Sequence, residues 1–280
     1  MALYTRIFMQ KNFLRIVYAL IYTLQTFLYT FKLWPIGFWT NFWFINEPLK
    51  KIKINNYEFW VRGDNLLLRL VDVYVFLESV VKNKYFENSF DLNEDATVID
   101  VGAHIGAFTI CAAHKAKRGR VYAFEPSLKN YEILERNVLL HSAANVSLFN
   151  LAVAGNNQER ILYIDGFNSG RHSFIKKTRK SIPVNCLTLK EVLITNQISK
   201  CDFLKMDCEG AEYEILLNTP IEILKKIDQI VLEYHSPEFL GLADKEIVNK
   251  LQAYLQAAGY QITVEKENYR RGYIYARRKK

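Results

Sequence analysis

The chain has 280 residues, of which 50% are apolar and 24% charged, a composition that excludes a disordered or fibrous protein. Its net charge of +8 comes from the two ends, since residues 1–53 carry seven basic residues and one acid, and residues 268–280 carry six basic residues and no acid. The segment between them, residues 54–267, has 24 basic and 28 acidic residues, a net charge of −4 that argues against nucleic acid as a partner.

The first segment, residues 1–48, is apolar and aromatic. Its sixteen residues from Ile16 to Phe31 carry no charge, but a membrane-spanning helix needs roughly 20 apolar residues. Three alternatives stay open: a helix packed on the protein or a partner, a helix lying in a membrane interface, and a true span. Because the basic ends favour an anionic surface, we predict residues 11–44 as a candidate for peripheral membrane contact.

Residues 49–95 form a short lead-in. Polar and apolar side chains alternate over residues 50–62 on both sides of Asn55 and Asn56, a pattern that predicts a β-hairpin with a tight turn. Residues 70–84 then predict one helix.

The third predicted unit, residues 96–280, alternates strands with helices. Core strands are expected at 97–102, 120–125, 146–150, 202–207 and 230–235, a peripheral strand at 161–165, and a closing antiparallel pair at 260–264 and 272–276. Helices are expected at 106–117, from an N-cap at Ser127 to about 140, from 211, and at 245–258. Repeated strand–helix units predict an α/β fold with a mostly parallel sheet and helices on both faces.

The first turn of this unit reads DVGAHIG over residues 100–106, with Gly102 at the end of the strand and Gly106 at the start of the helix. Glycines here let the backbone turn sharply beside a ligand. Glu125 ends the next strand, nineteen residues after Gly106, where an acid can accept both hydroxyl groups of a ribose. The two features together predict a nucleotide-like site.

Asp100 decides between cofactors. A dinucleotide site has glycine in this position, because a pyrophosphate rests on bare backbone at a helix N-terminus. An aspartate repels pyrophosphate but attracts the ammonium group of a methionine moiety. The residue therefore favours S-adenosylmethionine and disfavours an NAD(P)-dependent oxidoreductase.

Four stretches, VIDVGAHIGAFT (98–109), VYAFEP (121–126), DFLKMDCEGAE (202–212) and VLEYH (231–235), resemble the FkbM family of methyltransferases in order and spacing. The resemblance implies a class I methyltransferase Rossmann-like fold, a seven-stranded sheet with an antiparallel C-terminal strand, and O-methylation of a sugar, glycan or small metabolite. This sequence departs from the family's pattern at His104, where asparagine is usual. The resemblance implies S-adenosylmethionine contacts at Asp100, Gly102, Ala103, His104, Gly106, Phe124, Glu125, Pro126, Asn150 and Ala152.

Methyl transfer to oxygen needs a group that removes the hydroxyl proton. Asp207 and Glu209 follow one strand, and Glu233 and His235 end the next, so by the period-two rule each pair shares one side. We predict Asp207 or His235 as the general base, with Glu209 and Glu233 as orienting groups. The alternatives are that Glu209 and Glu212 are helix N-terminal acids and that His235 is a structural histidine.

The rest of the sequence bears on the cellular compartment, on metal binding and on the rival functions. The four cysteines form no CxxC pair and no cluster with zinc-ligand spacing. This indicates reduced thiols and therefore a cytoplasmic protein, with membrane association as an open alternative. A carboxylate cluster can hold a divalent metal, but the resemblance implies none and no metal is predicted. A nucleic-acid methyltransferase and a non-enzymatic binding module remain rival functions, and the expected partner is a hydroxyl-bearing small molecule or glycan.

Overall fold

A computed structural model of the protein describes residues 47–54, 57–88 and 90–279. The predicted membrane-contact segment, residues 11–44, lies outside the described residues. Across the residues that are described, no helix has both the length and the apolar character needed to cross a bilayer.

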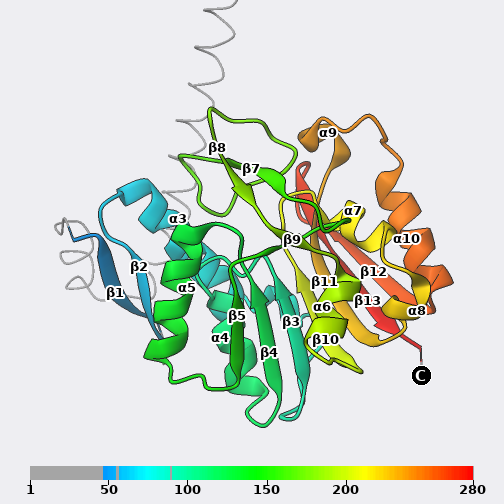
Figure 1. Ribbon diagram of the computed structural model, residues 1–280, viewed down its shortest axis with the longest axis horizontal. Helices are drawn as coiled ribbons and strands as arrows, with labels where there is room; N and C mark the ends of the chain where they lie inside the picture. The colour runs from blue at the N-terminus through cyan, green and yellow to red at the C-terminus, as the bar shows by residue number, and fades with distance from the viewer. Residues whose placement is uncertain (1–46, 55–56, 89, 280) are drawn as a thin grey trace, which may run out of the picture.

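A seven-stranded sheet forms the centre of the molecule (Figure 1). Its strands lie in the order β12-β13-β11-β10-β3-β4-β5, and β13 alone runs antiparallel to its neighbours. This topology confirms the predicted fold. The strands are β3 (Thr97–Val101), β4 (Arg120–Phe124), β5 (Val146–Phe149), β10 (Cys201–Met206), β11 (Ile227–His235), β12 (Tyr260–Lys266) and β13 (Arg271–Arg278).

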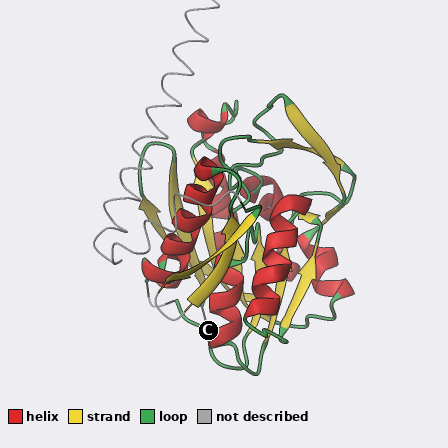
Figure 2. Ribbon diagram, turned by 90° about the vertical axis from the view of Figure 1, so that its left-hand side faces the viewer, coloured by secondary structure: helices red, strands yellow, loops and turns green. Residues whose placement is uncertain are grey.

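Both faces of the sheet are apolar and covered, as expected for parallel strands that alternate with helices. Alternate residues of β3, Ile99 and Val98, face two separate cores. The first core packs against α6 (Leu189–Thr195), α7 (Glu212–Leu217), α8 (Ile221–Leu224), α9 (Pro237–Leu240) and α10 (Ile247–Ala257). The second face is covered by α4 (Ala107–Lys115) and α5 (Leu128–Leu140), and Figure 2 shows the layers from the side.

The lead-in packs on this second face. β1 (Leu49–Ile54) and β2 (Tyr57–Arg62) pair antiparallel as predicted, and α3 (Leu66–Phe76) follows. The helix continues as a π-helix, η1 (Leu77–Val81), and the chain then forms a 3-10 turn, η2 (Lys84–Phe86). Apolar residues of β2 and α3 share one core with Ile105, Ala107 and Ile110 around the start of α4, so the lead-in is built into the wall of the main unit.

Two small strand pairs stand beside the central sheet. β7 (Arg160–Ile164) pairs with β8 (Lys180–Val184), which confirms the peripheral strand predicted at 161–165. β6 (Ala152–Val153) pairs with β9 (Cys186–Leu187). The segment between β7 and β8 crosses the carboxyl ends of the central strands, which places it over the candidate site.

Candidate functional site

A cavity of about 1000 Å³ opens at the carboxyl ends of the central strands, the edge where open α/β sheets bind ligands. Residues from η1 and from the loops at 168–172 and 267–271 complete its wall. Of the predicted site residues, those that line the cavity are Gly102, Ala103, His104, Phe124, Glu125, Pro126, Ala152, Asp207, Glu209 and His235. Asp100, Gly106 and Asn150 do not line it.

The glycine turn after β3 has the predicted form. Gly102 adopts a φ of +75°, and a Cβ on it would stand 1.9 Å from the carbonyl oxygen of Asp207. Gly106 adopts a φ of +92°, and a Cβ there would stand 2.6 Å from a methyl carbon of Leu134 on α5. The missing side chain of Gly106 therefore serves the packing of α4 against α5, and its predicted cofactor contact stays a prediction.

Asp100 is fully buried beneath the cavity, and its predicted contact with the cofactor stays a prediction. Its Oδ1 lies 3.0 Å from Nζ of Lys205, its register partner on β10, and its Oδ2 accepts a hydrogen bond from Thr109 at 2.6 Å. Lys205 Nζ also donates to the carbonyl oxygen of Gly102 at 2.7 Å. The pair thus holds the glycine turn from below.

Glu125 lies on the cavity wall with 5% of its surface exposed. Its carboxylate accepts hydrogen bonds from the backbone N–H groups of His104 and Ser127, each at 2.9 Å, and from the side-chain amide of Asn130 at 3.2 Å. Burial raises the pKa of the Glu125 carboxyl, against the effect of these hydrogen bonds. A carboxylate has about four acceptor sites, so one stays available to a ribose hydroxyl group.

Ser127 occupies the N-cap position of α5 as predicted, but its side chain makes no capping hydrogen bond. Its buried backbone N–H instead binds Glu125. The start of α5 therefore orients the carboxylate.

His104 presents a neutral imidazole to the cavity wall. Its backbone has a φ of +52°, and its Nε2 lies 2.9 Å from Oγ of Ser169. Burial, together with the nearby Arg62 guanidinium, lowers the pKa of His104 well below its usual value. Its Nδ1 is buried and has no hydrogen-bond partner among the described residues, so the turn carries an unpaired polar atom that a bound ligand can satisfy.

The adenine-side contacts predicted at Asn150 and Ala152 stay predictions, and the structure places the two residues differently. Ala152 and its neighbour Val153 line the cavity. The Asn150 side-chain amide points back and donates to the carbonyl oxygens of Glu125 and Pro126 at 2.9 and 3.2 Å. Asn150 therefore holds the β4–α5 turn and leaves the cavity wall to its neighbours.

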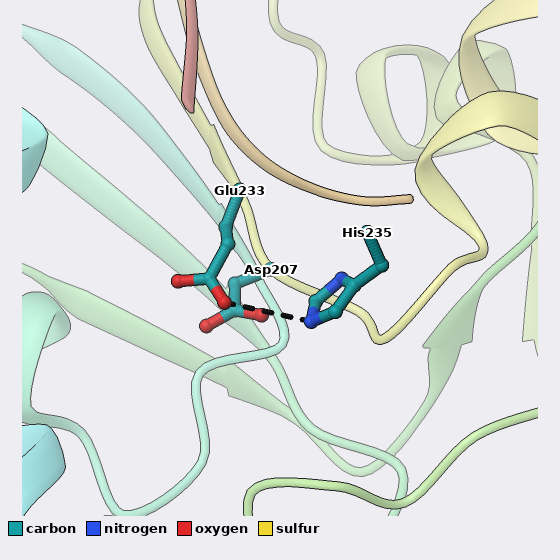
Figure 3. Close-up of side chains that lie close together, drawn as sticks. All are labelled: Asp207, Glu233 and His235. Carbon is teal, nitrogen blue, oxygen red and sulfur yellow. Dashed lines mark ion pairs between the residues drawn. The ribbon is translucent and has the colours of Figure 1, made fainter. Parts of the chain in front are cut away.

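The predicted chemical residues meet on the opposite side of the cavity. Figure 3 shows the carboxylates of Asp207 and Glu233 beside the imidazole of His235, and one donor atom from each lies within 4.8 Å of the other two. His235 Nε2 is 3.5 Å from Glu233 Oε1 and 3.4 Å from Glu209 Oε2. We call Asp207, Glu233 and His235 the acid–histidine cluster, with Glu209 beside it.

Carboxylates surround His235. Burial alone would lower its pKa, but Glu209, Glu212 and Glu233 outweigh that effect and raise it. Glu212, predicted as a helix N-terminal acid, accepts the backbone N–H groups of Cys208 and Gly210 at 2.8 Å each. Glu212 is therefore an acid at the start of α7, as one alternative held, whereas Glu209 lines the cavity.

Arg271, which binds Glu233 of the cluster, is the main residue beside the cluster that the sequence did not predict. It belongs to the basic C-terminal run, but its Nη1 contacts both carboxylate oxygens of Glu233 at 2.7 and 2.9 Å. Its Nη2 donates to Glu78 in the π-helix at 2.8 Å. For Arg271, this position replaces the expectation that the basic ends face an anionic surface. An antiparallel strand was the available signal, because β13 places Arg271 opposite His235.

A second undetected group links the lead-in to the cofactor side. Arg62 is 7% exposed, and its guanidinium group donates to the carboxylate of Asp72, to Oγ of Ser169 at 2.8 Å and to Oδ1 of Asn130. Asn130 in turn donates to Glu125. One buried polar network therefore runs from β2 to the predicted ribose acid.

A mostly parallel seven-stranded sheet, a glycine turn after β3 and a buried acid after β4 define a class I methyltransferase with S-adenosylmethionine as its cofactor. The residues present fit that molecule, since Glu125 keeps an acceptor site and His104 Nδ1 lacks a partner within the described chain. Residues 100–262 match the family described as Methyltransferase FkbM domain, which is more than half of the chain. The protein belongs to this family.

Three known proteins are similar to this chain. AmbE, the AMB antimetabolite synthetase of Pseudomonas aeruginosa, is 26% identical over 69% of this chain, which spans only 11% of AmbE. The 31-O-demethyl-FK506 methyltransferase FkbM of Streptomyces tacrolimicus is 21% identical over 69% of this chain and 84% of that protein. The crystal structure of Methyltransferase FkbM from Methylobacillus flagellatus aligns with a TM-score of 0.49 and 16% identity, over 69% of this chain and 46% of the other.

Proposed function

We propose that the protein transfers the methyl group of S-adenosylmethionine to a hydroxyl group of a small molecule or glycan. The observation that carries the proposal is the acid–histidine cluster, which lines the same cavity as the glycine turn and Glu125. One cavity of about 1000 Å³ has room for a cofactor and an acceptor side by side.

The two sides of the cavity have different tasks. When bound, the cofactor supplies an electrophilic methyl group on a positively charged sulfur. On its side, Gly102, His104 and Glu125 hold it in place. On the other side the acceptor oxygen gives up its proton to Asp207, Glu209 or His235 as it takes the methyl group. Holding the two reactants in line is itself a large part of the rate enhancement.

Oxygen is the favoured acceptor atom because the cluster offers groups that remove a proton. The similar protein of Streptomyces tacrolimicus is a 31-O-demethyl-FK506 methyltransferase, and its name supports oxygen as the acceptor atom. The acidic body of the chain disfavours nucleic acid as the acceptor. Membrane contact through residues 11–44 stays a proposal that brings the enzyme to an interfacial acceptor.

The test begins with the cofactor. Calorimetric titration with S-adenosylmethionine is expected to give micromolar binding that is lost in Glu125→Ala, while Glu132→Ala on the exposed side of α5 binds normally. Equal binding by both variants would contradict the assignment of Glu125.

The acceptor is then sought among hydroxylated sugars and metabolites, with S-adenosylhomocysteine release as the readout. The double variant Asp207→Asn/His235→Ala is expected to bind cofactor and to lose turnover by about 100-fold or more. Unchanged turnover in that variant would sink the proposed roles.

A further inference from the structure

We infer that the acid–histidine cluster is a binding site for one divalent cation, with Asp207, Glu233 and His235 as its protein ligands. The inference rests on the proposed function and deepens it, because the cation would hold the acceptor oxygen. Sequence patterns alone predicted no metal, since the three donors come from the ends of two different strands.

The geometry is that of a partial coordination shell. The three donor atoms all lie within 4.8 Å of one another, and because oxygen ligands stand about 2.0–2.6 Å from Mg²⁺ or Ca²⁺, two ligands of one ion lie up to about 5 Å apart. Two carboxylates and one imidazole suit Mn²⁺, because carboxylates favour Mg²⁺, Ca²⁺ and Mn²⁺ and imidazole favours transition metals. Three protein ligands on a cavity wall leave further positions for an acceptor.

Each carboxylate has an acceptor site to offer. Within the described part of the chain, the hydroxyl group of Tyr85 is the one donor to the Asp207 carboxylate, and it binds Oδ2 at 3.2 Å. Glu233 Oε2 accepts from Arg271 and from the hydroxyl group of Tyr273, whereas Oε1 accepts from Arg271 alone. Because each oxygen has two lone pairs, Oε1 keeps one, and Oε1 is the oxygen that lies 3.5 Å from His235 Nε2.

The second, independent observation is the state of His235. Its side chain is 4% exposed, and its Nδ1 has no hydrogen-bond partner among the residues that the structure describes. Nε2 faces Glu209 and Glu233, and the Glu212 carboxylate stands 3.9 Å behind Nδ1. A metal-binding histidine usually has a carboxylate beside the ring nitrogen that points away from the ion, and Glu212 stands on that side of His235, although at 3.9 Å the two are not hydrogen-bonded. Nε2 is the ring nitrogen that faces the carboxylates of the proposed site.

The charges around the cluster also require a cation. Asp207, Glu209 and Glu233 gather where two permanent positive charges act, and both are shared with other acids: Lys205, which acts on Asp207, is paired with Asp100, and Arg271 is shared among Glu233, Glu78 and Glu267. Buried carboxylates that are not matched by cations are costly. A divalent ion would balance the excess.

The chemistry follows from these positions. A hydroxyl group bound to the cation is more acidic than a free one, and with Asp207 and His235 as ligands Glu209 is left to take its proton. The oxygen then forms the bond to the methyl carbon while the carbon–sulfur bond breaks, and S-adenosylhomocysteine leaves. The inference thus selects one base from the proposed three.

The experiment is direct titration of the chelator-treated, full-length protein with Mn²⁺ in the presence of S-adenosylmethionine, followed by the electron paramagnetic resonance signal of free Mn²⁺. The wild type is expected to bind one Mn²⁺ per chain. Asp207→Asn and His235→Asn are each expected to weaken binding by about ten-fold or more. Glu214→Gln, on α7 but paired with Arg160, is the matched control and should bind as the wild type does.

Cofactor affinity and thermal unfolding of each variant show whether it is folded, so Asp207→Asn carries the test if His235→Asn does not fold. Absence of binding by the wild type at millimolar Mn²⁺, or wild-type affinity in both variants, would overturn the site. Mn²⁺ binding needs no acceptor. If Mn²⁺ binds as expected and no hydroxyl compound is methylated, the proposed function fails and the cation site stands.

Discussion

Gly102 lies against the backbone of Asp207, so closely that a Cβ on the glycine would stand 1.9 Å from the Asp207 carbonyl oxygen. The first residue belongs to the cofactor turn and the second to the acid–histidine cluster. Their contact joins the two sides of the cavity through backbone atoms, which have little room to move. We expect the distance between cofactor and acceptor to depend on this contact.

The first prediction tests that contact. Gly102→Ala is expected to destabilise the protein by more than about 2 kcal/mol and to weaken S-adenosylmethionine binding by more than about ten-fold, because it adds a backbone clash to the strain of a positive φ. Gly241→Ala is the matched control: its φ is +73°, but a Cβ there meets nothing within 4 Å. It should cost only the conformational strain, about 1 kcal/mol. Equal unfolding free energies for the two variants would contradict the clash.

The second prediction concerns Arg62, whose guanidinium joins the lead-in to Asn130. Arg62→Met leaves the buried Asp72 carboxylate without its cation, so we expect a loss of about 3–5 kcal/mol in denaturant unfolding. Cofactor binding should weaken as well, because Asn130 positions Glu125. Arg118→Met removes two exposed ion pairs, with Glu94 and Asp95, and should cost less than about 1 kcal/mol.

The third prediction is a double-mutant cycle on the pair beneath the glycine turn. Lys205→Met leaves Asp100 as an uncompensated buried charge and should cost about 3–5 kcal/mol. Asp100→Asn in the same chain should restore much of that loss, because the charge is then gone. Additive losses in the double variant would show that the two side chains stabilise the fold independently.

The fourth prediction is a pH dependence set by His172. Burial, with the nearby Arg62 charge, lowers the pKa of His172 from 6.5 to about 4. Between these values the unfolded chain binds a proton that the folded chain does not, so the free energy of unfolding falls as pH drops from 6.5 toward 4. We expect this residue to account for about 1–2 kcal/mol of the loss between about pH 7 and about pH 4.5.

His172→Asn should remove that part of the loss. Its side-chain oxygen can still accept the backbone N–H of Asp165, which His172 Nδ1 accepts at 3.2 Å. Urea unfolding of both proteins at the two pH values measures the difference. Parallel curves would contradict the role of His172.

The sequence was sufficient for the sheet and for half of the site. Strand–helix alternation and the turn residues are local patterns, so β3, β4 and their glycine turn could be read from neighbouring residues. Glu125 followed from its spacing to Gly106. These predictions needed no knowledge of which distant residues meet.

Contacts between residues that are far apart in the sequence account for what could not be predicted. The position of Asp100 suggested a ligand contact, but its charge is matched by Lys205, which lies more than 100 residues later in the sequence and beside it only through strand register. The sequence placed Arg271 only in a basic C-terminal run, because the composition of that run says nothing about the register of β13. The Arg62 network likewise arises from packing between the lead-in and α5, which no local spacing encodes.

The order of strands in the sheet also has a consequence for the growing polypeptide. β13 lies between β11 and β12 but is synthesised after both, and Arg271 at its start is the last residue of the cavity wall to be made. A nascent chain can therefore build the glycine turn and Glu125 while Glu233 and Glu78 still lack the cation that they share. Glu233 and Glu78 therefore gain their shared cation only once β13 has been made, and a protease that cuts at residues 267–270 would separate Arg271 from β12.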